Sequence, residues 1–156
     1  MTAIADRLAV LGLEVPPLAA AAGAYIPAVI SGNLVFTSGQ LPFTSGTLPA
    51  TGKVGAADSG VTAEDAKTYA ATCVLNALAA VQSAIGSLDR VTRVVKVVGF
   101  VASDPSFTGQ PGVINGASEL LGEIFGAAGV HARSAVGVAV LPLDSPVEVE
   151  LIVEFA

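Results

Sequence analysis

Apolar and polar residues alternate along the C-terminal part of the chain, a pattern typical of strands with two different faces. In residues 147–155, valine, leucine and phenylalanine occupy every second position, and glutamates fill most of the positions between them. Residues 133–140 alternate between Ser134 or valine on one side and Arg133, alanine or glycine on the other. Residues 91–101 are apolar on both sides, which predicts a strand in the centre of a sheet.

The N-terminal part of the chain is divided into short elements by residues that break regular structure. Residues 3–13 predict a short helix that ends at the Pro16-Pro17 pair. Residues 25–30 and 34–40 are rich in strand formers and flank a Ser-Gly-Asn turn, which predicts a hairpin. Because Pro27 has no N–H to donate, its strand should lie at an edge or begin late.

Two segments repeat apolar residues every three or four positions, which predicts helices over residues 62–86 and 111–126. Thr62 and Asp65 have the spacing of a capping box, and Gly86 is placed to end the first helix. Helices of this length between strands cross over one face of a sheet. The order ββαβαββ therefore predicts an α+β domain with a mixed sheet and two helices on one face.

The two faces of the C-terminal strands differ in size and polarity. We expect the valine faces to pack against the helices. The opposite face is too small-sided for a core and too poor in charge for an ordinary solvent surface, so we expect a subunit interface with a cleft there. Its predicted residues are Arg133, Ala135, Gly137, Glu148, Glu150 and Glu154.

The composition narrows the class of protein. The 156 residues fit one domain, and only 13% are charged while 53% are hydrophobic, so we expect an oligomer that hides apolar surface between subunits. Residues 15–52 carry no charge, but their prolines exclude a membrane-spanning helix. The N-terminus does not resemble a signal peptide, and the single cysteine, Cys73, makes the cytoplasm the expected location.

The charged and metal-binding residue types disfavour two further functions. The net charge of −6 leaves few cations for phosphate contacts, so we expect no nucleic-acid partner. Only Arg90, Arg93 and Lys96 form a basic cluster. One histidine and one cysteine, His131 and Cys73, cannot form a zinc cluster, so no metal or cofactor is expected.

Arg133 stands alone, because no other charged residue lies between Glu123 and Asp144. An arginine on an otherwise apolar strand needs an anion, since an unpaired buried charge costs several kcal/mol. Two anions are possible from the sequence: a glutamate of the chain, Glu148 or Glu150, or the carboxylate of a ligand. Structural ion pairs are the commoner case, so the spacing alone favours the first.

Three segments resemble the RidA/YjgF family of small trimeric proteins. The first is Gly23-Ala24-Tyr25, followed by Gly32-Asn33 and by Thr37-Ser38-Gly39-Gln40-Leu41-Pro42. The second is Val113-Ile114-Asn115 in the predicted second helix, of which Asn115 carries the likeness. The third is Ala132-Arg133-Ser134, followed by Leu141-Pro142 and Val147-Glu148-Val149-Glu150.

The resemblance implies a chorismate-mutase-like domain over residues 23–156, preceded by an N-terminal extension over residues 1–22. It also implies a homotrimer with clefts between subunits. Active relatives hydrolyse reactive 2-enamino and 2-imino acids to 2-oxo acids and ammonia, which makes a small carboxylate the expected ligand. The alternatives are a noncatalytic carboxylate-binding or chaperone-like trimer, and an endoribonuclease or translation inhibitor, which the acidic balance disfavours.

The resemblance also implies roles for individual residues. Arg133 would bind the substrate carboxylate, and Glu148 would lie near an activated water. Ala135 stands where many relatives have cysteine, which is expected to change the shape of the pocket but not to end catalysis. The residues expected to line the pocket with Ala135 are Tyr25, Ser38, Gly39 and Asn115.

Overall fold

Five strands form one mixed sheet in the order β1-β2-β5-β3-β4, as seen in a computed structural model that describes residues 3–20, 23–58 and 60–156. The strands β3 and β4 run parallel, and every other neighbouring pair is antiparallel. The strands are β1 (Ala28–Ser31), β2 (Leu34–Thr37), β3 (Val91–Ala102), β4 (Ala132–Val138) and β5 (Val147–Phe155). The mixed sheet and the ββαβαββ order are as predicted, and β1 begins directly after Pro27.

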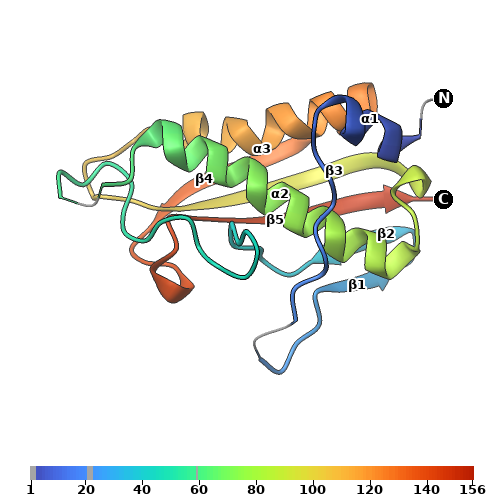
Figure 1. The fold of residues 1–156 in the computed structure, drawn as a ribbon, viewed down its shortest axis with the longest axis horizontal. Helices are drawn as coiled ribbons and strands as arrows, with labels where there is room; N and C mark the ends of the chain where they lie inside the picture. The colour runs from blue at the N-terminus through green and yellow to red at the C-terminus, as the bar shows by residue number, and fades with distance from the viewer. Residues whose placement is uncertain (1–2, 21–22, 59) are drawn as a thin grey trace.

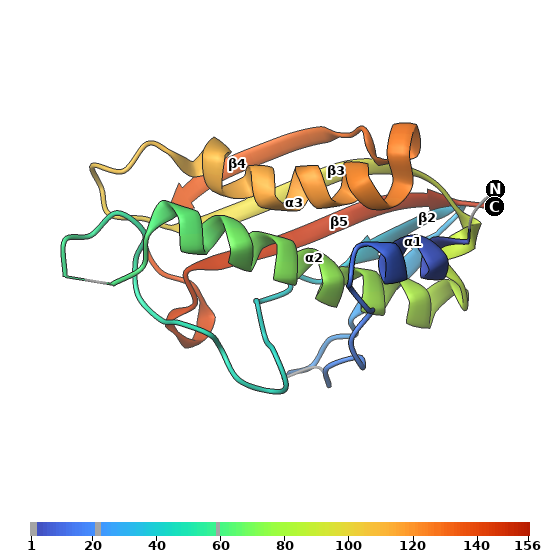
Figure 2. The ribbon, with the colours of Figure 1, turned by 45° about the horizontal axis from the view of Figure 1, so that its top comes forward.

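Two long helices cover one face of the sheet and leave the other face open (Figures 1 and 2). The first of these two long helices, α2, begins after its cap Thr62, whose hydroxyl accepts a hydrogen bond from the Asp65 N–H. It ends at Gly86, whose φ is 84°. The helices are α1 (Ile4–Val10), α2 (Ala63–Ile85) and α3 (Gln110–Phe125), with short 3-10 turns at Leu88–Arg90, Gly126–Gly129 and Pro142–Asp144.

The N-terminal helix α1 lies against the outer side of this helical layer (Figure 2). Its Arg7 Nε donates to the Glu123 carbonyl of α3 at 2.8 Å, and the Ile4 N–H donates to Asp89 Oδ1 at 2.7 Å. The helix is shorter than predicted, because Gly12 takes a positive φ of 70° before the prolines are reached. The predicted N-terminal extension continues to residue 22, and its positions 21 and 22 lie outside the described residues.

The core lies between the sheet and the helices α2 and α3. The apolar positions of β5 are buried as predicted, and Leu78 of α2 and Ile114 and Leu121 of α3 are completely buried against the sheet layer. Each such side chain contributes about 1.5–3 kcal/mol of burial free energy. In the part of the chain that the structure describes, α2 alone is long and apolar enough to cross a membrane, but half of its apolar window is buried inside this core.

A bulge in β3 changes which of its residues face the helices. The register with β5 shifts between Val94 and Lys96, so Val94 and Val97 both point into the core. Strict alternation along residues 91–101 would place Val94 on the face of Val98 and Phe100, and the bulge instead moves Val94 to the core face. The strand is nevertheless central, as predicted, because β5 and β4 flank it.

The strand β4 presents its smaller face to the helices, which reverses the prediction. Its residues Arg133, Ala135 and Gly137 pair with the core-facing positions of β3, whereas Val136 is 45% exposed on the open face. The reason is the close approach of α3: a Cβ on Gly99 would overlap the Ile114 side chain, and one on Gly137 would lie 2.8 Å from the Gln110 amide. Only small side chains fit beneath α3 there.

This close approach predicts a large cost for one added methyl group. Gly99→Ala should lower the free energy of unfolding by about 1–3 kcal/mol, because the buried Ile114 side chain must move. Gly122→Ala in α3 is the matched control, since its Cβ would meet nothing within 4 Å, and it should raise stability by about 0.5–1 kcal/mol. Urea unfolding of both variants measures the difference, and equal effects would contradict the packing described.

Candidate functional site

Arg133 lies at the junction of β4 and α3, where it contacts two polar side chains of the helix. Its Nη1 donates to Asn115 Oδ1 at 2.8 Å and to Ser118 Oγ at 3.3 Å. Ser118 Oγ is in turn 2.9 Å from His131 Nε2, and His131 Nδ1 is 2.6 Å from the Gly129 carbonyl oxygen. These residues, Arg133, Asn115, Ser118 and His131, are named the arginine cluster below.

The guanidinium keeps one edge available for an anion. Both hydrogens of Nη1 are used by Asn115 and Ser118, while Nε and Nη2 donate to none of the described residues. The Nε–Nη2 edge presents two parallel N–H groups, the arrangement that binds a carboxylate in bidentate fashion. No carboxylate among the described residues lies within ion-pair distance of Arg133, so its charge is not neutralised within the chain.

The sequence identified Asn115 and Arg133 but missed their two supporting residues. Ser118 is three positions after Asn115 on the same helix, so the two share one helix face. His131 is two positions before Arg133, and alternate residues of a strand point to one side. These spacings could have predicted the cluster once Arg133 was assigned to the helix-covered face.

Glu148 lies on the opposite, open face of the sheet, at the start of β5. It is half-buried beside Gly39, and a Cβ at position 39 would overlap its carboxylate, so a larger residue there would force the Glu148 side chain to move. Burial raises the pKa of the Glu148 carboxyl, and the negative charge of Glu150 raises it further. A carboxylate with a raised pKa is a stronger base, which suits proton abstraction from water near neutral pH.

Ser38 lies next to Gly39 and is bonded to the segment that follows Tyr25. The Ser38 hydroxyl donates to the Ile26 carbonyl at 2.7 Å, and its N–H donates to the Pro27 carbonyl at 2.8 Å. Tyr25 itself is 52% exposed, and it is placed here only by its neighbours in the chain. Residues Ser38, Gly39 and Glu148 are named the glutamate cluster.

One chain does not bring the two clusters together. Arg133 of β4 pairs with Val97 of β3, whose side chain faces the helices, so Arg133 lies on the helix-covered face. Glu148 of β5 pairs with Phe100 of β3, whose side chain lies on the open face. Strands β4 and β5 are separated by β3, which places their backbones about 10 Å apart. The prediction that Arg133 and Glu148 share one face is therefore wrong, and so is their pairing on adjacent strands. Ala135 lies on the face of Arg133, close to the core.

The open face that carries Glu148 has no helix over it (Figure 2) and combines apolar side chains with the glutamates of β5. Val29 of β1 and Val136 of β4 are about half exposed there, at 52% and 45%. The partly exposed Phe36, Phe100 and Ile152 lie on the same face by register. Uncovered apolar side chains that are gathered in this way are typical of an interaction surface.

The other candidates raised by the sequence have structural roles. Cys73 is fully buried, and burial raises the pKa of its thiol well above the ordinary range, which makes it a poor nucleophile. In the basic cluster, Arg90 donates to the Ala156 and Ile85 carbonyls and stacks over Phe155, and Arg93 pairs with Glu154. The described residues contain no group of three potential metal ligands.

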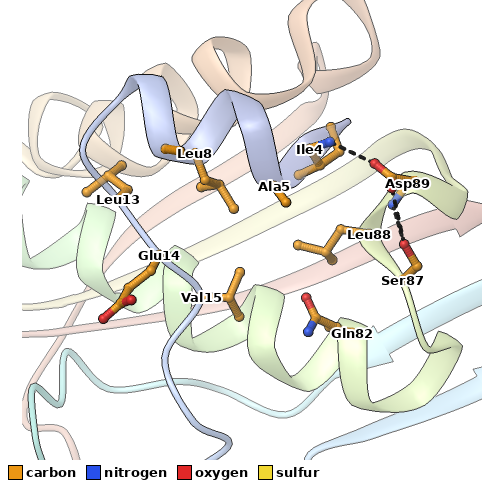
Figure 3. Close-up of a pocket in the computed structure, with 11 residues that line it drawn as sticks. Ile4, Ala5, Leu8, Leu13, Glu14, Val15, Gln82, Ser87, Leu88 and Asp89 are labelled. Carbon is orange, nitrogen blue, oxygen red and sulfur yellow. Dashed lines mark hydrogen bonds between the residues drawn. The ribbon is translucent and has the colours of Figure 1, made fainter. Parts of the chain in front are cut away.

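The cavity drawn in Figure 3 lies elsewhere, between α1 and the C-terminal end of α2. Its volume is about 400 Å³, and its floor includes Leu8 and Leu88. Asp89 at its rim is already bonded to the Ile4 N–H and to Ser87. None of its lining residues belongs to the arginine or glutamate cluster.

Known proteins share both the sequence and the fold. A sequence model of the family described as "YjgF/chorismate_mutase-like, putative endoribonuclease" matches residues 5–155. The protein TCP17 of Trypanosoma cruzi is 45% identical over 152 residues, which cover 97% of this chain and 93% of TCP17.

Two solved structures illustrate the likeness in three dimensions. Atu1372 of Agrobacterium tumefaciens, a protein with unknown function, is 45% identical with a TM-score of 0.89, and the match covers 98% of this chain and 92% of that one. TdcF of E. coli, solved with bound serine, is 26% identical with a TM-score of 0.64, covering 91% and 94%. The predicted chorismate-mutase-like α+β fold is confirmed. Because the match spans nearly the whole chain, this protein belongs to the YjgF/RidA family.

Proposed function

We propose that this protein hydrolyses 2-imino and 2-enamino acids to 2-oxo acids and ammonia, in a site formed between copies of the chain. The observation that carries the proposal is the unpaired Nε–Nη2 edge of Arg133, which is oriented by neutral side chains and fits a small carboxylate. The relative TdcF was solved with serine, a small molecule that also carries a carboxylate. No cofactor is needed, because the imine carbon reacts with water directly.

In the proposed reaction, Arg133 holds the substrate carboxylate while Glu148 acts on water. Glu148 takes a proton from water as the water oxygen forms a bond to the carbon of the protonated imine, which gives a carbinolamine with an NH2 group. Glu148 then returns this proton to the amine nitrogen. The C–N bond breaks as the carbonyl forms, ammonia departs, and the hydroxyl proton passes through Glu148 to the ammonia. An enamine first gains a proton at carbon to become the imine. The raised pKa of Glu148 suits both the uptake and the return of a proton.

A second copy of the chain would complete the site. The two clusters lie on opposite faces, so the β4 edge of one copy must approach the open face of another for Arg133 and Glu148 to meet. The exposed apolar side chains of the open face support such an association. In a closed ring of three copies, every copy would cover one neighbour with its β4 edge and be covered by the other on its open face. We propose a homotrimer that acts in the cytoplasm, where a lone buried cysteine is typical.

A noncatalytic carboxylate-binding trimer would use the same edge of Arg133 without a role for Glu148. The raised pKa of Glu148 favours catalysis over binding alone. Ribonuclease activity has less support, because Arg90 and Arg93 are engaged within the chain and the net charge is −6.

Replacement of Arg133 should abolish most activity toward substrates that carry a carboxylate. With 2-iminopropionate generated in situ, we expect Arg133→Ala to lower kcat/KM by about 100-fold or more, and Arg133→Lys to be intermediate because lysine cannot bind in bidentate fashion. Lys67→Ala is the control, since Lys67 forms only an exposed pair with Glu119. Equal rates for Arg133→Ala and wild type would contradict the deaminase proposal, and carboxylate binding without imine loss would support the noncatalytic alternative.

Mixed assemblies can test whether the site joins two copies. Arg133→Ala and Glu148→Gln should each be inactive alone, but an intact site forms where the Arg133 of one variant meets the Glu148 of the other. After denaturation together, refolding and random assembly at equal ratio, activity should recover to about a quarter of the wild-type value. Separately refolded variants mixed without exchange provide the control. No recovery in the exchanged mixture would contradict a site shared between copies.

The pH dependence of activity should follow the raised pKa of Glu148. A base must be ionised, so kcat/KM should rise with pH along a limb that lies above the range of an ordinary glutamate, about pH 4.3. Glu150→Gln removes a negative charge that opposes ionisation of Glu148, and it should therefore move this limb to lower pH. Glu154→Gln, which changes a more distant carboxylate of the same strand, should leave the limb in place. Identical limbs in wild type and Glu150→Gln would contradict the assignment of Glu148.

A further inference from the structure

A chain of hydrogen bonds runs from the backbone of the turn after α3 to the guanidinium of Arg133. The Gly129 carbonyl oxygen, His131, Ser118 Oγ and Arg133 Nη1 are linked by contacts of 2.6, 2.9 and 3.3 Å. His131 and Ser118 are half-buried, so the links are partly shielded from water. Asn115 also accepts a hydrogen bond from the same Nη1. The linked groups of Gly129, His131, Ser118 and Arg133 are named the relay.

The direction of the bonds follows from the chemistry of the end groups. A carbonyl oxygen only accepts, so His131 Nδ1 carries the hydrogen that it shares with Gly129. In the neutral ring Nε2 is then an acceptor, and the Ser118 hydroxyl donates to it. The Ser118 oxygen is left with its lone pairs toward Arg133, which donates to it. Each group in the relay therefore has one consistent role.

The Gly129 end of the relay is fixed by backbone packing. Gly129 is buried against α3, and a Cβ at this position would overlap the Leu121 carbonyl group. Since only glycine permits this approach, the Gly126–Gly129 turn is held closely against the helix that carries Ser118. The carbonyl that orients His131 is consequently a rigid reference point for the side chains beyond it.

The relay orients Arg133 without neutralising it. A free arginine side chain loses rotamer entropy when it is fixed, and a relay fixed in advance removes part of that cost from ligand binding. An acidic partner would also fix the side chain, but it would compete with the ligand for the charge. The acceptors here are both neutral oxygens, so the positive charge of the guanidinium is not neutralised and its Nε–Nη2 edge stays available for an anion.

We propose that Ser118 and His131 are positioning residues that direct the Nε–Nη2 edge of Arg133 toward the carboxylate of the substrate. This inference rests on the proposed function, because the relay has a purpose only if Arg133 binds a carboxylate ligand. Neither residue would touch the substrate; both would act through Arg133.

The variants Ser118→Ala, His131→Phe and His131→Gln test the relay in the full assembled protein. Ser118→Ala removes the group that joins histidine to arginine, and His131→Phe keeps the ring shape without hydrogen bonds. Each should raise the KM for 2-iminopropionate about 10-fold and change kcat less, in line with the loss of about one charged hydrogen bond. His131→Gln can still offer an amide oxygen to Ser118, and it should remain within about 3-fold of wild type.

A double-mutant cycle separates positioning from a general structural role. In an Arg133→Ala background, Ser118→Ala should have no further effect on kcat/KM, because the residue through which it acts is gone. Calorimetry with pyruvate, a 2-oxo acid product, gives a second readout that needs no turnover, and the same non-additivity is expected in its Kd.

The outcomes distinguish this inference from the proposed function. If wild type hydrolyses imines or binds pyruvate but Ser118→Ala behaves like wild type, or if its effect adds fully to that of Arg133→Ala, the relay is overturned and the proposed function stands. If wild type neither hydrolyses imines nor binds pyruvate, both are overturned. Thermal unfolding of each variant identifies any loss that comes from misfolding, and His131→Gln then provides the folded comparison.

Discussion

Successive side chains of a strand point to opposite faces of the sheet, and this alternation decides where the two charged groups of the candidate site lie. The register pairs Arg133 with a core-facing residue of β3 and Glu148 with a residue of the open face. No change of rotamer moves a side chain through a sheet, so the proposed site needs a second copy of the chain. The family's fold, its open apolar face and the unpaired guanidinium become consistent with one another once a second copy is included.

The position of α3 gives the arginine its surroundings. Gly99 and Gly137 allow the helix to lie close to β3 and β4, and Ala135 adds only a methyl group to the same face of β4. Because the helix is so close, Asn115 and Ser118 reach the guanidinium at the point where the strand face ceases to be covered. The tight packing that stabilises the domain is thus the same packing that orients its free cation.

The hydrophobic periodicity was sufficient to predict the elements of the fold, because each buried face repeats with the period of its helix or strand. Local chemistry decides where some elements begin and end, and it could therefore be read from single residues. Examples are the helix caps Thr62 and Gly86 and the late start of β1 after Pro27. The bulge in β3 could not be predicted, because valines occur on both faces of this strand and a single inserted position leaves its apolar pattern looking regular.

The candidate site was predicted residue by residue, but its geometry was not. Sequence spacing placed Arg133 with the smaller residues of β4 correctly, yet it assigned that face to the open side, because a valine face is normally the buried one. The open face of this sheet also carries apolar side chains, such as the half-exposed Val136, so the usual contrast between a buried apolar face and an exposed polar face is weak in β4. The roles of Ser118 and His131 depended on knowing that Arg133 lies next to α3.

A crystal structure of the assembled protein with pyruvate bound would test the central claim most directly. We expect the pyruvate carboxylate to lie on the Nε–Nη2 edge of Arg133 from one copy, with the Glu148 carboxylate of a neighbouring copy facing the 2-oxo carbon. Pyruvate bound away from Arg133, or a trimer in which Arg133 and Glu148 of different copies remain on separate surfaces, would contradict the account.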